Sequence, residues 1–295
     1  EKSKSGVITL VENEVFKENV GEDTVVSYAR LTGCLSKILT TEETINMVKG
    51  KVLHAEMSDS NSSRFAILVL NAFLKDSPKS IVDSGLFEET CSFLIRASQS
   101  TIQYVSDNAT IAIGKLLLGI KNLSDSDEYE ESIENLVEQL CILTDKPASQ
   151  SMDTRRLSLV VIRTICRYDY ENTIEPYLDT LIPSVFACVR DSMIPIKLAA
   201  EKCLLALTKL VEDPSNKVFI SWMEGRNSTD KVKTATGKEI QIRSISEYIK
   251  RVGSRLAKVE RERLAAGGDR EAMFSDQFED EREIWAVGGV DLRKE

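Results

Sequence analysis

The sequence predicts an all-α fold, an α-solenoid of helical hairpins followed by a distinct C-terminal helical extension. Amphipathic stretches of roughly 14–20 residues recur in pairs of roughly 35–45 residues, which is the pattern of stacked helical repeats. Polar turns separate the two members of each pair. With only 6 prolines and 14 glycines in 295 residues, the chain has too few turn-forming residues for an all-β sandwich.

The clearest hairpin covers residues 176–210. Apolar residues at helical spacing predict a helix over 178–189, and a second helix follows from Ile194 after the polar break 190–192. The carboxylate of Asp191 is expected to cap backbone amides in this turn. A basic residue near the start of a second helix, such as Lys197 or Arg155, is placed to contact a neighbouring turn.

Four to five such pairs are predicted before Val211. Because one hairpin cannot bury its apolar face alone, neighbouring hairpins must stack to complete a core. The period fits HEAT or armadillo repeats better than tetratricopeptide repeats, whose W-x-x-L-G pattern is missing. A globular helical bundle is the alternative. The other helices are expected to begin near residues 23, 41, 64, 87, 102, 133 and 155.

Three regions are predicted along the chain. Residues 1–21 are the end of an upstream repeat or an irregular lead-in, and residues 22–211 hold the HEAT-like repeats. Residues 212–295 hold a terminal helix pair, a basic helix and an acidic, aromatic tail. Residues 225–239 are expected to form a loop and 244–262 a helix with one apolar stripe. The acidic stretch 274–285 has the opposite charge to this helix and is a candidate to fold back on it.

Composition narrows the class of function. A net charge of −9 disfavours a general nucleic-acid binder but leaves room for a local basic face. The 6 cysteines form no C-x-x-C pair and are interpreted as buried free thiols in a reducing compartment, the cytosol or the nucleus. The predicted location is cytoplasmic. No signal peptide and no run of 18 apolar residues are visible, so no membrane segment is expected. The chain begins at Glu1 without a methionine and is interpreted as a piece of something longer.

Nothing in the sequence points to catalysis. The phosphate-binding, dinucleotide-binding and nucleophile-elbow glycine motifs are all missing. His54 is the single histidine and is interpreted as a packing or surface residue, so no metal site and no catalytic triad are expected. The prediction is a binding protein that uses no cofactor.

The candidate partner-binding residues are basic. Those near the starts of second helices can form a row of donors that grips carboxylates or phosphates, or a structural ladder that pairs with neighbouring turns. Those on the basic helix can contact an acidic partner or RNA, or form a solvated face with pairs such as Glu247–Arg251. The two sets are Arg64, Arg155, Arg156 and Lys197, and then Arg251, Arg255 and Lys258.

Two passages carry a family resemblance, Ile-Pro-Ile-Lys-Leu-Ala-Ala-Glu-Lys-Cys at 194–203 and the stretch 268–289 with Phe-Glu-Asp-Glu-Arg-Glu-Ile-Trp. Both resemble the C-terminal part of the large general-control translational activators, the HEAT-repeat activators of the initiation-factor-two-alpha kinase. The resemblance implies a ribosome-associated scaffold in the response to amino-acid starvation. It also implies partners with RWD domains, found on the kinase and its competitors, although the main RWD-binding segment should lie partly upstream.

Two other functions stay open. A ribosome- or RNA-binding module would use the basic helix 243–263 and bind with steep salt dependence. An importin-like adaptor for extended peptides would need a groove with exposed tryptophans, and the chain has only Trp222 and Trp285.

Overall fold

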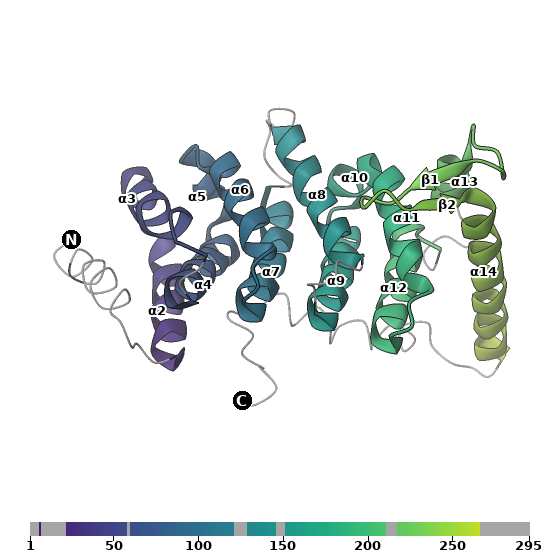
Figure 1. Ribbon diagram of the computed structural model, residues 1–295, viewed down its shortest axis with the longest axis horizontal. Helices are drawn as coiled ribbons and strands as arrows, with labels where there is room; N and C mark the ends of the chain where they lie inside the picture. The colour runs from purple at the N-terminus through teal and green to yellow at the C-terminus, as the bar shows by residue number, and fades with distance from the viewer. Residues whose placement is uncertain are drawn as a thin grey trace. The chain divides into compact units, whose positions relative to one another are not determined.

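A computed structural model of the chain describes residue 6 and residues 22–57, 60–120, 129–145, 151–210 and 217–265. These residues are almost entirely helical, as the all-α solenoid prediction required (Figure 1). The described residues divide into two compact units, one up to Ser132 and one from Ile133 onward. Apart from residue 6, the predicted lead-in 1–21 lies outside the described residues, as does the tail 266–295.

In the first unit, α4 packs between α2 and α7, and α6 packs on α7. The hairpins therefore stack through their second helices, as expected for a solenoid. The described elements of this unit are α2 (Glu22–Ser36), α3 (Thr41–Met47), the π-helical segment η1 (Val48–Leu53), α4 (Ser60–Asp76), α5 (Pro78–Asp83), α6 (Phe87–Ser98) and α7 (Gln103–Ile120).

Local sequence explains where these helices begin. A capping box at Thr40 begins α3, close to the helix start expected near residue 41. The amide of Glu43 donates to Thr40 Oγ1 at 3.3 Å, and the amide of Thr40 donates to Glu43 Oε2 at 2.7 Å. Helix α4 ends at Asp76, just before Pro78, because proline disfavours a helical conformation in the residue before it.

In the second unit, α12 packs against both α9 and α11 (Figure 1). Helix α12 has Pro195 in its first turn, where a missing backbone N–H is tolerated. The elements are α8 (Glu130–Thr144), which begins in the last residues of the first unit, α9 (Met152–Tyr168), α10 (Tyr170–Thr173), the 3₁₀ turn η3 (Glu175–Tyr177), α11 (Leu178–Val189), α12 (Ile194–Leu207), α13 (Lys217–Met223), β1 (Lys231–Lys233), β2 (Glu239–Gln241) and α14 (Ile242–Ala265).

A short β-hairpin that the sequence did not reveal begins within the expected loop 225–239 and ends at Gln241. Strands β1 and β2 pair antiparallel, with Val232 opposite Ile240. Gly237 has a φ of 82°, a left-handed conformation that glycine adopts without strain, and its amide donates to the carbonyl of Thr234 at 2.8 Å. The hairpin leads directly into α14 and fixes where that helix starts.

The interior of each unit is mostly aliphatic. Buried aromatic rings are few; the largest fully buried side chains include Phe73, Phe87, Phe93 and Phe186. Among the described helices, none combines the length and apolar character needed to cross a membrane.

Candidate protein-interaction groove

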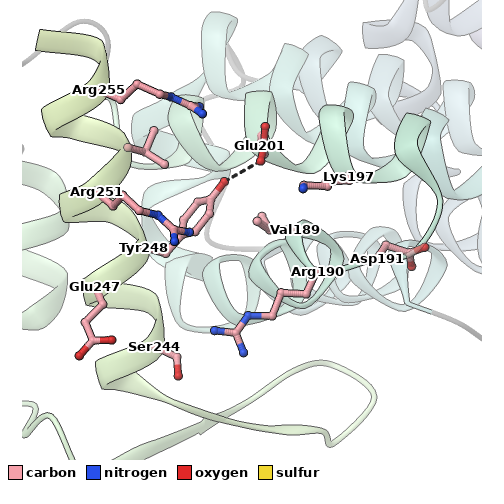
Figure 2. Close-up of a pocket in the computed structure, with 11 residues that line it drawn as sticks. Val189, Arg190, Asp191, Lys197, Glu201, Ser244, Glu247, Tyr248, Arg251 and Arg255 are labelled. Atoms are coloured by element: carbon pink, nitrogen blue, oxygen red, sulfur yellow. Dashed lines mark hydrogen bonds between the residues drawn. The ribbon is translucent and has the colours of Figure 1, made fainter. Parts of the chain in front are cut away.

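A groove of about 510 Å³ runs between α14 and the start of the last solenoid hairpin's second helix, all within the second unit. One wall is the α11–α12 turn and the first turns of α12, and the other is α14 (Figure 2). We call it the cationic groove; its lining residues are Val189, Arg190, Asp191, Lys197, Glu201, Ser244, Glu247, Tyr248, Arg251, Val252 and Arg255.

The apolar stripe of α14 holds this helix against the solenoid. Ile245, Ile249 and Val252 are buried and follow the predicted helical spacing. The side chains of Tyr248, Arg251 and Arg255 lie three or four residues apart, so they point along one edge of the helix toward the groove (Figure 2).

The opposite wall is fixed by a buried ion pair. Arg155 of α9 donates from Nη2 to Asp191 Oδ2 at 2.6 Å, and both side chains are under a tenth exposed. Its Nε donates to the carbonyl of Thr144 at 3.1 Å. Asp191 Oδ1 also accepts the amide of Met193 at 2.9 Å, as the capping prediction required. The turn that precedes α12 is therefore tied to the neighbouring repeat.

Tyr248 lies in the groove between the two walls. Its hydroxyl donates to Glu201 Oε1 at 3.0 Å, and its ring meets Phe186 edge-on, with 5.7 Å between centroids. The guanidinium of Arg251 lies 5.3 Å from the centroid of the Tyr248 ring. Burial raises the pKa of Tyr248 to about 12, with the Glu201 hydrogen bond adding to the shift, so the phenol stays a donor at neutral pH.

The acidic side chains of the groove are each engaged by the chain itself. Asp191 holds Arg155, Glu201 accepts from Tyr248, and Glu247 is paired with Arg243 at 2.6 Å. The Arg243 pair lowers the pKa of the Glu247 carboxyl, so this group remains charged. Arg243 thus takes the place of the predicted partner Arg251 for Glu247.

The basic side chains of the groove have a different environment. Lys197, Arg251 and Arg255 are exposed, and within the described residues no ion pair joins any of them to a carboxylate. Exposed Arg190 has its guanidinium 5.3 Å from the Phe186 ring. The groove therefore presents four cations that no ion pair joins to a carboxylate among the described residues. Of its three carboxylates, Asp191 and Glu247 are paired with arginines, whereas Glu201 is bonded to a neutral phenol and keeps its charge. Guanidinium groups are suited to bind carboxylates and phosphates with two parallel hydrogen bonds.

The structure brings together three of the seven predicted site residues, Lys197, Arg251 and Arg255. Lys258 lies one turn further along α14, outside the groove lining, and approaches Glu262 at 3.8 Å. Arg155 is buried in the ion pair with Asp191, as the ladder interpretation of these arginines expected.

The other two predicted residues also lie away from the groove. Arg156 is half-buried in α9, and Arg64 belongs to the first unit. The guanidinium of Arg64 lies 5.5 Å from the centroid of the Tyr104 ring.

The sequence analysis missed three residues of the groove. In the sequence, Arg190 belongs to the polar break 190–192, Glu201 to the motif at 194–203, and Tyr248 to the apolar stripe of the predicted helix 244–262. The sequence did contain a signal for Tyr248, which is a tyrosine on an otherwise aliphatic stripe, three residues before Arg251. Its hydroxyl needs a hydrogen-bond partner when the side chain is half-buried. The described residues contain no cluster of His, Cys, Asp or Glu able to hold a metal ion.

Comparison with known proteins places the chain in a family. Residues 64–218 match the family described as GCN1-like, C-terminal HEAT repeats. The chain belongs to this family. It is 48% identical over 303 aligned residues to the eIF-2-alpha kinase activator GCN1 of Saccharomyces cerevisiae, a match that covers 99% of this chain and 11% of that protein.

A more distant relative is Protein ILITYHIA of Arabidopsis thaliana, 23% identical over 197 residues, which covers 65% of this chain and 7% of that protein. The chain thus spans only about a tenth of the length of these relatives. Among solved structures, a designed armadillo repeat protein gives a TM-score of 0.43 at 14% identity, over 70% of this chain and 82% of its own. An engineered protein gives a TM-score of 0.44 at 17% identity, over 76% of this chain and 91% of its own.

Proposed function

We propose that this chain is a non-catalytic scaffold segment of a cytoplasmic translational regulator that recruits or activates the initiation-factor-two-alpha kinase. The relative in Saccharomyces cerevisiae is named an activator of that kinase, which supports the proposal. In this proposal the partner is an RWD-type domain that docks at the cationic groove. The observation that carries it is the set of four basic side chains in the groove that no ion pair joins to a carboxylate among the described residues.

The geometry favours an acidic protein surface as the partner. Arg251 and Arg255 lie one helical turn apart on α14, and Lys197 faces them from α12 (Figure 2). Carboxylates spaced along a partner helix or loop can meet these groups in turn. A kinase held in this way is kept at a high local concentration beside its activating ligand, so activation follows from proximity without a chemical step by the scaffold.

The test is binding of an isolated RWD domain to the chain, measured by isothermal calorimetry. We expect Arg251→Glu with Arg255→Glu to weaken binding by about 10- to 100-fold, since each lost charge-assisted hydrogen bond is worth one or more kcal/mol. The control is Lys238→Glu with Lys250→Glu, which makes the same change in net charge at exposed positions outside the groove. Equal affinity of the groove variant and the control would contradict the groove as the docking site.

A second function is favoured by one specific observation, the line of exposed cations on α14. Lys250, Arg251, Arg255 and Lys258 are all exposed, and two of them lie outside the groove lining. A ribosome or RNA contact would use all four, because phosphate binding depends on summed charge. We expect Lys250→Glu with Lys258→Glu to reduce ribosome binding and its salt dependence while leaving RWD binding unchanged. Loss of both activities in that variant would contradict the assignment of RWD binding to the groove residues alone.

A further inference from the structure

Beside the cationic groove, three apolar side chains at the start of α12 are exposed to solvent. Met193, Ile194 and Leu198 are 42%, 70% and 52% exposed. We call these three residues the apolar shelf. Five apolar residues of α12 face the core: Ile196, Ala200, Cys203, Leu204 and Leu207. The shelf is therefore an addition to the surface and not part of the repeat packing.

The shelf and the groove form one surface. Ile194 lies three residues before Lys197, and Leu198 lies three residues before Glu201, so each pair shares a side of α12. Lys197 and Glu201 line the groove. A ligand that fits this surface needs apolar side chains for the shelf and carboxylates for Lys197, Arg251 and Arg255.

The chain itself contains a segment with that chemistry. Residues 274–281, Phe-Ser-Asp-Gln-Phe-Glu-Asp-Glu, carry four carboxylates, no basic residue, and two phenylalanines four positions apart. The spacing of Phe274 and Phe278 matches that of Ile194 and Leu198. We call residues 274–281 the acidic segment.

The connecting chain is long enough for this contact. Helix α14 ends at Ala265, and nine residue steps separate it from Phe274. At about 3.4 Å per extended residue these steps reach about 30 Å. Arg255 and Arg251 lie only about 15 and 21 Å back along α14, at 1.5 Å of rise per residue. A linker of this length gives an effective concentration on the order of millimolar at the groove.

We infer that the acidic segment is an internal ligand of this chain, which docks on the apolar shelf and the cationic groove and competes with an external acidic partner. The docking itself does not depend on the proposed function; only the competition does. If the acidic segment as a separate peptide binds the groove with a dissociation constant on the order of 0.1 mM, a millimolar effective concentration means that it occupies the groove in most molecules. Releasing the segment then raises partner affinity by about tenfold.

The docking is tested on the full chain with no partner present, by a zero-length carbodiimide cross-link between lysine amines and carboxylates. We expect Lys197 to be joined to the peptide containing residues 276–281, as identified by mass spectrometry. The cross-link should disappear in Phe274→Ala with Phe278→Ala, which removes the apolar contact but keeps every carboxylate. It should persist in Phe87→Leu, a buried substitution in the first unit.

Two results would overturn the inference. One is cross-linking of the acidic segment to Lys197 no more often than to exposed Lys238 and Lys250. The other is a link that forms mainly between ¹⁴N- and ¹⁵N-labelled chains, since this would assign the surface to a second copy.

The competition is tested by measuring RWD affinity for the variant Phe274→Ala with Phe278→Ala. A cross-link that responds as expected, with RWD affinity unchanged, would refute the groove as the partner site but leave the docking intact.

Discussion

Arg155 and Asp191, 36 residues apart in the sequence, form a buried ion pair with an Nη2–Oδ2 distance of 2.6 Å. The pair joins the start of α9 to the turn that precedes α12. Arg155 was a candidate partner-binding residue in the sequence, and the ion pair gives it a structural role instead. Substituting Arg155 would therefore test the stability of the second unit and would confound any binding measurement.

We expect Arg155→Ala to lower the free energy of unfolding by about 3–5 kcal/mol, because it leaves the Asp191 carboxylate buried without its counter-ion. Urea denaturation followed by circular dichroism measures this change. The matched control is Lys197→Ala, a basic residue in the corresponding region of α12 that is exposed, with an expected effect within about 0.5 kcal/mol. Similar small effects for both variants would contradict a structural role for the pair.

Two helical glycines are predicted to respond to alanine in opposite directions. A Cβ on Gly119 of α7 would lie 2.3 Å from Cβ of Pro78, whereas a Cβ on Gly253 of α14 would meet Leu210 at 3.6 Å, an ordinary contact. We expect Gly253→Ala to stabilise the fold by about 0.5–1 kcal/mol through helix propensity. Gly119→Ala should destabilise it by about 1–3 kcal/mol through the clash. Thermal unfolding of the two variants beside the wild type checks both signs.

The titration of Tyr248 offers a test of the groove geometry. Its pKa of about 12 lies above the ordinary value of 10.0, so the folded state holds the phenolic proton more tightly than the unfolded state. The stabilisation is present below pH 10 and is lost as the pH rises through 12. The difference in ultraviolet phenolate absorbance between the wild type and Tyr248→Phe should appear near pH 12. A phenolate that forms near pH 10 would mean that Tyr248 is neither buried nor bonded to Glu201.

The six cysteines should differ sharply in reactivity. Cys34 is exposed, whereas Cys91, Cys141, Cys166, Cys188 and Cys203 are buried. Burial raises the pKa of Cys91 and of Cys141 to about 12, so their reactive thiolates are scarce at neutral pH. Brief treatment with iodoacetamide should add one group, on Cys34, and none to Cys34→Ser. Rapid modification of a second cysteine in the native protein would contradict the packing described for these helices.

Attachment of α13 should depend on Trp222. Its Nε1 donates to Asp179 Oδ1 of α11 at 2.8 Å, Arg226 pairs with the same carboxylate, and the ring stacks on Phe219. We expect Trp222→Ala to cost about 3–5 kcal/mol of unfolding free energy, since it removes a large buried ring. Circular dichroism in urea measures it. This burial also removes Trp222 as an exposed groove residue of the kind that an importin-like adaptor needs.

Helical periodicity was sufficient to predict the solenoid because each helix buries one stripe of apolar residues. The stripe Ile245, Ile249 and Val252 placed α14 within a few residues of its observed bounds. Periodicity could not find the β1–β2 hairpin, since three-residue strands are too short to show an alternating pattern. It located Asp191 as a cap but could not identify Arg155 as its partner, which depends on the stacking of two repeats.

The sequence by itself determined the class of fold, the helix faces and the excess of cations on α14, because these depend on the order of residues within one element. Only the tertiary structure decided which basic residues are available. Arg155 and Lys197 occupy similar places near the starts of α9 and α12, yet one is buried against Asp191 and the other is open to the groove. The physical reason is that exposure is set by the neighbouring element, and a linear pattern does not specify which element that is.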